Sequence, residues 1–140
     1  MIDYGKFEKS LKHLQLQYNN YKTLDNREDL GVLEKEAIAE SVIQRFEICY
    51  DSLWKVLKRY LIEELGIPDM PNSPKPVIHI AFENQLFNSS INQWLKYAEA
   101  RIDTSHDYSE NKAFKALELM GDFIDDAIDL YITMSGKIFE

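Results

Sequence analysis

The stretch VIQRFEICYDSLWKVLKRYL, residues 42–61, decides the fold of this chain. Its apolar residues recur at steps of three and four, the period of an α-helix that buries one face. We expect a long helix over about residues 32–65, closed by Gly66 and prevented from resuming by Pro68. Its apolar stripe comprises Val42, Phe46, Cys49, Leu53, Leu57, Tyr60 and Leu61.

The same period predicts four more helices. The first carries a stripe over residues 7–21 and precedes a polar loop over residues 21–30. A short helix begins at Ser73-Pro74 and runs to about Phe87, because a capping hydroxyl followed by proline is a helix start. Asn88-Ser89-Ser90 caps the next helix, and Ser109 with Lys112 forms a partial cap for the last. The expected apolar faces of these last two helices are Ile91, Trp94, Leu95, Ala98 and Ile102, and then Ala113, Leu117, Met120, Ile124, Ala127, Tyr131, Met134 and Ile138.

The order of these elements predicts the fold class. The sequence shows neither the alternation of a β-strand nor a hairpin signal. Residues 77–81 alone could form a strand, but they follow the Ser-Pro helix start, which favours a helix. We therefore expect an all-α protein, an antiparallel up-down four-helix bundle with one additional short helix. The length of 140 residues favours a single domain over residues 1–140.

Composition limits the classes of function. The net charge of −8 excludes a broad surface that tracks phosphates, so nucleic-acid contact would be local or supplied by a partner. No apolar run approaches the roughly 20 residues of a membrane span, and Met1-Ile2-Asp3-Tyr4 does not resemble a signal peptide. The single cysteine, Cys49, cannot form an internal disulfide, which favours a reducing, cytoplasmic setting.

The stretch RIDTSHDY, residues 101–108, carries the candidate chemistry. Arg101 is suited to hold a phosphate, and His106 to move a proton near neutral pH. A five-residue helical step rotates by about 140°, so the two side chains meet only if the helix ends near Thr104 or Ser105. The alternative is a solvated helix end. Tyr108 adds a phenol, a candidate site of modification.

Other polar residues favour structural interpretations. An acidic stripe on the last helix lies opposite the apolar face, and no inward Glu-x-x-His pair accompanies it, so we expect a solvated face, no metal and no cofactor. His13 and His79 are lone histidines, and Cys49 is expected to be buried and inert. A basic cluster on the second helix is too small to indicate RNA binding. The stripe is Glu118, Asp122, Asp126 and Asp129, and the cluster is Lys55, Lys58 and Arg59.

Three further residues are candidate contacts for a partner or nucleotide: Trp94, Asp103 and Asp107. For Trp94 and likewise Trp54, packing in a core or subunit interface is the alternative to stacking on a base. The chain has neither a Gly-rich phosphate loop nor the Gly-Ser turn with paired aspartates of a nucleotidyltransferase, so it is not expected to transfer nucleotides itself.

Several of these motifs together resemble the nucleotidyltransferase substrate-binding proteins of the HEPN superfamily. The residues that carry the resemblance are Val42–Glu47, Leu53–Lys58, Tyr60-Leu61, Ser73-Pro74, Ala81-Phe82, Trp94-Leu95 and Arg101–Tyr108, in that order. The resemblance implies a helical homodimer in complex with a separate minimal nucleotidyltransferase, often as a toxin–antitoxin module. It also implies that Arg101 and His106 match the Arg-x4-6-His motif of metal-independent ribonucleases, and that Tyr108 matches a tyrosine to which the partner transfers AMP.

The chain departs from the family pattern at one position, and three hypotheses about its function remain. Ribonuclease-active members usually carry a polar residue after the arginine, whereas this chain has Ile102, which we expect to pack inward.

The leading hypothesis is a non-catalytic substrate-binding and partner subunit that presents Arg101, His106 and Tyr108. The second is an endoribonuclease that binds RNA in a local cleft and uses Arg101 and His106. The third is a bundle whose motif has no function.

Overall fold

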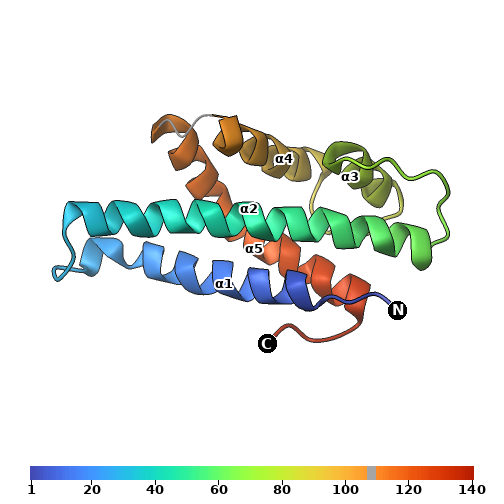
Figure 1. Cartoon of the computed structure of the whole chain (residues 1–140), viewed down its shortest axis with the longest axis horizontal. Coiled ribbons are helices and arrows are strands. Elements are labelled where there is room, and N and C mark those ends of the chain that lie inside the picture. Colours follow the sequence, from blue (N-terminus) through green and yellow to red (C-terminus); the bar gives the residue numbers. More distant parts are fainter. Residues whose placement is uncertain (107–109) are drawn as a thin grey trace.

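The computed structural model describes residues 1–106 and 110–140, and for His106 and Glu110 it describes the backbone alone. The described residues form five α-helices and no strand: α1 (Gly5–Lys22), α2 (Val32–Glu63), α3 (Pro74–Glu83), α4 (Ile91–His106) and α5 (Glu110–Ser135). A single 3₁₀ turn, η1 (Leu24–Asn26), lies between α1 and α2. Helices α1, α2, α4 and α5 alternate in direction, with α2 as the longest and the short α3 beside α4 (Figure 1). This confirms the expected all-α fold with one extra short helix.

Local sequence signals set the helix ends. Gly66 takes a left-handed φ of 66°, and the N–H groups of Gly66 and Ile67 donate back to the carbonyls of Ile62 and Leu61, which closes α2. Ser90 caps α4, because its Oγ accepts the N–H of Gln93 at 3.1 Å.

Two expected helix ends need correction. Pro74 begins α3 as expected, yet the Ser73 side chain makes no capping bond, and the helix ends at Glu83 rather than near Phe87. The expected cap at Ser109 lies outside the described residues.

Aromatic rings connect the helices in the core. Phe123 of α5 meets Phe46 of α2 edge-on at 5.0 Å between ring centroids, and meets Tyr97 of α4 edge-on at 5.1 Å. Trp94 of α4 contacts Tyr97 edge-on and stacks on Phe87 at 4.1 Å. Three helices and the segment before α4 therefore share one set of ring contacts, which fixes their relative rotation.

The structure corrects three expectations about burial. Ile102 is 42 % exposed instead of packing inward, and Ile138 follows the end of α5 and is exposed. Asp126, expected on a solvated face, is 8 % exposed and accepts hydrogen bonds from Ser89 Oγ at 2.5 Å and from the Tyr97 hydroxyl. Burial and the bond to Asp126 raise the pKa of Tyr97. The buried carboxylate thus has partners from α4 and the preceding loop, as a buried charge requires.

The position of Trp94 yields a stability prediction. Trp94→Ala removes a ring that is 1 % exposed, and truncation of a large buried aromatic costs about 3–5 kcal/mol. Chemical denaturation monitored by circular dichroism should show this loss. Phe82→Ala is the control, because that ring is 40 % exposed and should cost much less. Equal losses for both variants would contradict the placement of Trp94 in the core.

The thiol of Cys49 yields a second prediction. Burial raises its pKa to about 12, against about 8.5 for an unfolded cysteine. We expect no alkylation by iodoacetamide in the native protein at pH 8 and complete alkylation in concentrated guanidinium. The contribution of this neutral thiol to stability is fully present below about pH 8.5 and is lost as the pH rises towards 12. Rapid native labelling would show that the thiol is accessible.

Candidate functional site

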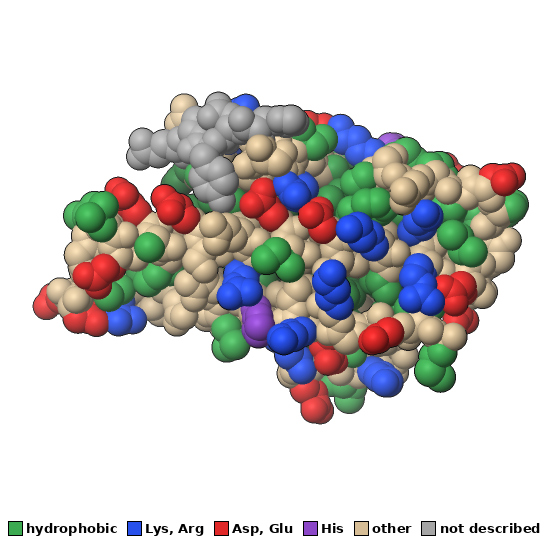
Figure 2. All heavy atoms as spheres, in the orientation of Figure 1, with side chains coloured by type: hydrophobic (Ala, Val, Ile, Leu, Met, Phe, Trp, Pro, Cys, Tyr) green, Lys and Arg blue, Asp and Glu red, His purple; other side chains and the backbone are tan. Residues whose placement is uncertain are grey.

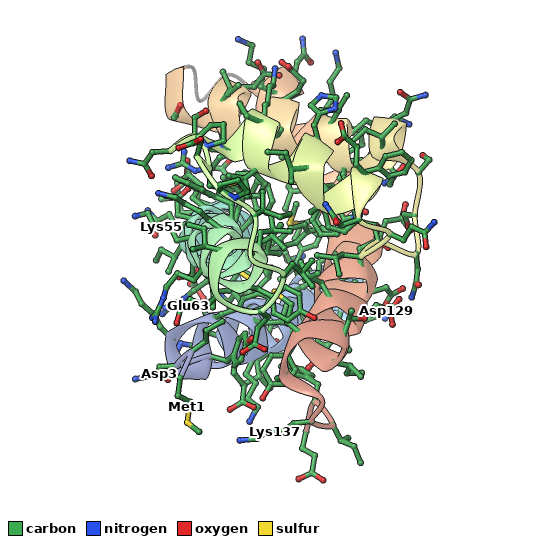
Figure 3. The ribbon with its side chains drawn as sticks, turned by 90° about the vertical axis from the view of Figure 1, so that its right-hand side faces the viewer. Met1, Asp3, Lys55, Glu63, Asp129 and Lys137 are labelled. Carbon is green, nitrogen blue, oxygen red and sulfur yellow. The ribbon has the colours of Figure 1, made fainter. Side chains whose placement is uncertain are left out.

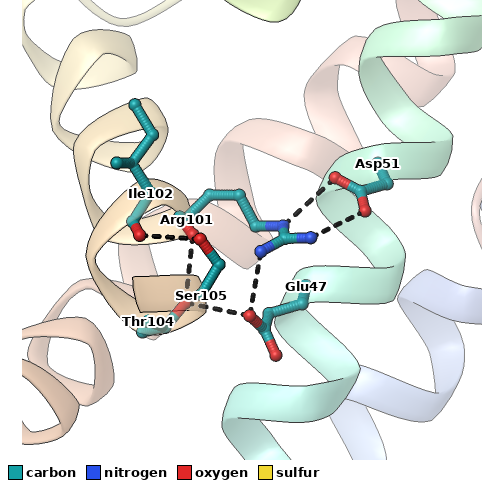
Figure 4. A network of polar contacts seen from close by, with 6 residues as sticks. All are labelled: Glu47, Asp51, Arg101, Ile102, Thr104 and Ser105. Carbon is teal, nitrogen blue, oxygen red and sulfur yellow. Dashed lines mark hydrogen bonds and ion pairs between the residues drawn. The ribbon is translucent and has the colours of Figure 1, made fainter. Parts of the chain in front are cut away.

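Arg101 crosses from α4 to α2 and binds two carboxylates (Figure 4). Its Nε and Nη2 donate to the two carboxylate oxygens of Asp51 at 3.1 and 3.0 Å, which is a bidentate contact. Its Nη1 donates to Glu47 Oε2 at 2.9 Å. Three of the five guanidinium N–H groups are therefore used by the protein itself.

Helical spacing places these groups together. Glu47 and Asp51 are four residues apart on α2 and so share one face of that helix. Thr104, one turn after Arg101, is buried, and its single O–H lies within reach of two acceptors, Glu47 Oε2 at 3.1 Å and the Arg101 carbonyl at 3.3 Å. The network thus joins two consecutive turns of α4 to two consecutive turns of α2.

The electrostatics of this network affect its use as an anion site. The bonds to Asp51 raise the pKa of Arg101 and outweigh the lowering effect of burial, so the guanidinium stays charged. One cation between two carboxylates leaves the cluster with formal charge −1. A phosphate that approaches Arg101 finds two N–H groups unused by these carboxylates, and it is repelled by the net negative charge of the cluster unless it displaces a carboxylate or further positive charge accompanies it.

The structure describes only some of the expected site residues. The backbone of α4 is helical through His106, one residue beyond Ser105, so the helix ends close to the point at which Arg101 and His106 could meet. The side chain of His106 lies outside the described part of the chain, as do Asp107 and Tyr108. Asp103 is half-buried in the last turns of α4.

Trp94 takes a different place from the one that nucleotide stacking needs. Its ring lies in the core, 1 % exposed, with Phe87 stacked on one face and Tyr97 against it edge-on. No face remains open for a base, and core packing is the role that the geometry supports.

A hollow of about 400 Å³ lies beside Arg101 between α2, α3 and α4. We call it the Arg101 hollow. Its surface is almost wholly apolar, and Ile102 forms part of it, which explains why this side chain is exposed. The residues that line it are Tyr50, Ser73, Pro74, Lys75, Pro76, Ala98, Arg101 and Ile102.

Tyr50 stands out among the lining residues. Its ring is buried, and burial together with the nearby Asp51 charge raises the pKa of its phenol. Its hydroxyl has no hydrogen-bond partner among the described residues. Because the hollow exposes almost only apolar atoms, it suits the apolar part of a small organic molecule.

Two kinds of feature are absent from the described residues. No group of three or more His, Cys, Asp or Glu residues there is arranged to hold a metal ion. The described helices also include none that is long and apolar enough to cross a membrane.

The site also contains four residues that no sequence pattern had indicated as functional: Glu47, Tyr50, Asp51 and Thr104. The available signal was the pair of acids four residues apart, which share one face of the helix. Their partner lies about fifty residues away in the chain, and only the packing of α4 on α2 identifies it.

The Arg101 network yields a prediction with a matched control. Arg101→Met leaves two facing, partly buried carboxylates without their cation, and should lower the free energy of unfolding by about 1–3 kcal/mol. Arg59→Met removes a single exposed ion pair with Glu63 and should cost about 0.5 kcal/mol or less. Urea denaturation of both variants measures the difference. If the two losses are equal, the network contributes no more than a surface pair.

The chain is similar in sequence to a known protein family and in fold to a solved structure. The family model described as "Nucleotidyltransferase substrate binding protein like" matches residues 2–135. The fold is similar to the crystal structure of ttk003001694 from Thermus thermophilus, with 27 % sequence identity and a TM-score of 0.65, over 87 % of this chain and 98 % of that one. No curated protein matches significantly. Because the family model spans nearly all of the sequence, this chain belongs to the nucleotidyltransferase substrate-binding-protein-like family.

Proposed function

We propose that this chain is the non-catalytic, substrate-binding and partner subunit of a two-protein minimal nucleotidyltransferase system in the cytoplasm. The observation that carries the proposal is the family match over residues 2–135. The sequence supports it, because the chain lacks the Gly-Ser turn and paired aspartates that nucleotidyl transfer needs. A separate chain would supply them, and this chain would act as a homodimer in a toxin–antitoxin arrangement.

The Arg101 hollow is the natural place for the apolar part of a substrate. It is walled by two prolines, Ala98 and Ile102, and Arg101 lies at its edge. In this proposal the carboxylates on Arg101 hold its side chain in place beside the hollow. The substrate or the partner then brings whatever additional charge the site needs.

A ribonuclease function for Arg101 and His106 receives less support. Catalysis of RNA cleavage needs the arginine to face the phosphate and to stabilise the charge that develops there. In this protein the guanidinium instead faces Glu47 and Asp51, and both carboxylates would repel a phosphate. We therefore place binding ahead of RNA cleavage.

Tyr108 is the proposed site of nucleotidylation within this system. The partner would transfer AMP from ATP to the phenol oxygen, with loss of the phenolic proton and release of pyrophosphate. The proposal rests on the match of Arg101, His106 and Tyr108 to the Arg-x4-His-x-Tyr motif.

Intact-mass measurement tests this proposal. The chain is incubated with the adjacent-gene nucleotidyltransferase, ATP and Mg²⁺, and peptides are mapped. We expect the mass of one added AMP on Tyr108 and no addition in Tyr108→Phe. An unmodified chain beside a transferase that is active on another acceptor would contradict nucleotidylation. Co-purification of the two chains then tests the partner role separately.

RNA cleavage in the presence of EDTA tests the competing function. We expect no cleavage that depends on Arg101 and His106. Activity that is lost in both Arg101→Ala and His106→Ala would establish the ribonuclease instead.

A further inference from the structure

Basic side chains gather on one face of this acidic protein. Figure 2 shows Lys and Arg side chains concentrated over the middle of α1 and α2, although the net charge is −8. Two neighbouring hollows, of about 380 and 250 Å³, lie on this face and share Lys6 and Ile48. The α1–α2 basic surface consists of Lys6, Lys9, Arg45, Lys55 and Arg59, arranged around Ile48.

The spacing of these residues explains why they share a face. On α2 the outward positions 45, 48, 52, 55 and 59 follow steps of three and four, and on α1 positions 6, 9 and 13 do the same. Both stripes lie beside the residues that the two helices bury, along the line where α1 and α2 meet. Helices α1 and α2 pack side by side in opposite directions (Figure 1). The two stripes therefore meet at the hollows that share Lys6 and Ile48, and together they form one strip.

Most of the positive charge on this surface is uncompensated. Lys6 and Lys9 form no ion pair within the described part of the chain, Arg45 contacts only His13 there at 3.5 Å, and Lys55 lies over the Trp54 ring.

Two of the three nearby acids are paired with an arginine, whereas among the described residues Asp3 bonds only to a backbone N–H and keeps its negative charge. Asp51 gives both oxygens to Arg101, Asp3 accepts the N–H of Gly5, and Glu63 pairs with Arg59. In the end view of Figure 3, Lys55, Asp3 and Glu63 lie on one side of the molecule and the acidic Asp129 on the other.

The chemistry of the surface favours a protein over a nucleic acid. Ile48 is 49 % exposed at the centre of a ring of cations, and an apolar centre with a charged rim is the anatomy of protein interfaces. A nucleic acid would extend past the strip onto the acidic remainder of the chain, where it is repelled. A compact acidic segment of a protein can contact the basic strip without reaching the acidic remainder of the chain.

We propose that the α1–α2 basic surface docks an acidic segment of the nucleotidyltransferase partner, with one apolar side chain of that segment packed on Ile48. This inference rests on the proposed function, since it assigns a surface to that partner. It also connects two parts of the protein. Asp51 lines the larger hollow of the docking surface and is the bidentate ligand of Arg101, so the docked partner lies next to the Arg101 network.

Charge reversal with a charge-matched control tests the docking surface. Lys6→Glu/Lys55→Glu removes two cations from the strip, whereas Lys96→Glu/Lys115→Glu makes the same change in net charge on exposed positions of α4 and α5. All four side chains are exposed, and circular dichroism melts verify that the variants fold. Affinity for the purified transferase is measured by calorimetry at low and moderate salt.

We expect the strip variant to lose at least about tenfold in affinity and most of its salt dependence, and the control to stay within about threefold of the wild-type chain. Ile48→Ser should weaken binding while the salt dependence persists. Equal affinities of the strip variant and the control would overturn the docking surface and leave the partnership intact. A wild-type chain that fails to bind the transferase would overturn both proposals.

A parallel titration with a single-stranded RNA oligonucleotide covers the other class of macromolecule. We expect weak binding that is the same for the strip variant and the control. RNA binding that only the strip variant loses, together with unchanged transferase binding, would reassign the surface to nucleic acid.

Discussion

The burial of α2 is the constraint on which the rest of this structure depends. At 32 residues it is the longest helix, and α1, α3, α4 and α5 all pack against it. Its inward stripe must be covered, because a helix of this length with so many large apolar residues is not stable alone in water. Covering that stripe leaves two other faces of the same helix to be used differently. One presents Glu47 and Asp51 to α4, and another presents Arg45, Ile48 and Lys55 to solvent.

Helical period accounts for the parts of the fold that the sequence predicted. The buried stripe of α2, its end at Gly66 and the core position of Trp94 follow from local spacing and local turn chemistry. The family resemblance, drawn from ordered motifs over residues 42–108, is confirmed by the family model over residues 2–135. Each of these features depends on residues that lie close together in the chain or on motifs in a fixed order, so the sequence alone can predict them.

The predictions that were wrong or missing concern positions that are set by packing between helices. The helical phase of Ile102 predicts an inward position. In the structure this side chain lines the open Arg101 hollow beside α3, so it stays exposed. Asp126 is buried because Tyr97 and Ser89, from elsewhere in the chain, supply hydrogen bonds to it. The carboxylates that hold Arg101 come from a helix about fifty residues earlier. No spacing rule within one helix predicts such partners. The chemistry expected of His106, Asp107 and Tyr108 stays a prediction.

The engagement of Arg101 changes what its motif can do by charge alone. A guanidinium in bidentate contact with Asp51 and bonded to Glu47 is already compensated, so its field at the hollow is weaker than that of a free arginine. A ligand gains from Arg101 only if it uses the two remaining N–H groups or displaces a carboxylate, and displacement leaves an unpaired charge that is costly to bury. Asp51 faces the α1–α2 basic surface as well as Arg101. A partner that changes the charge around Asp51 from the side of Lys55 and Arg59 therefore also changes how firmly Arg101 is held. If the partner docks there as proposed, the α1–α2 basic surface and the Arg101 network share one carboxylate, that of Asp51.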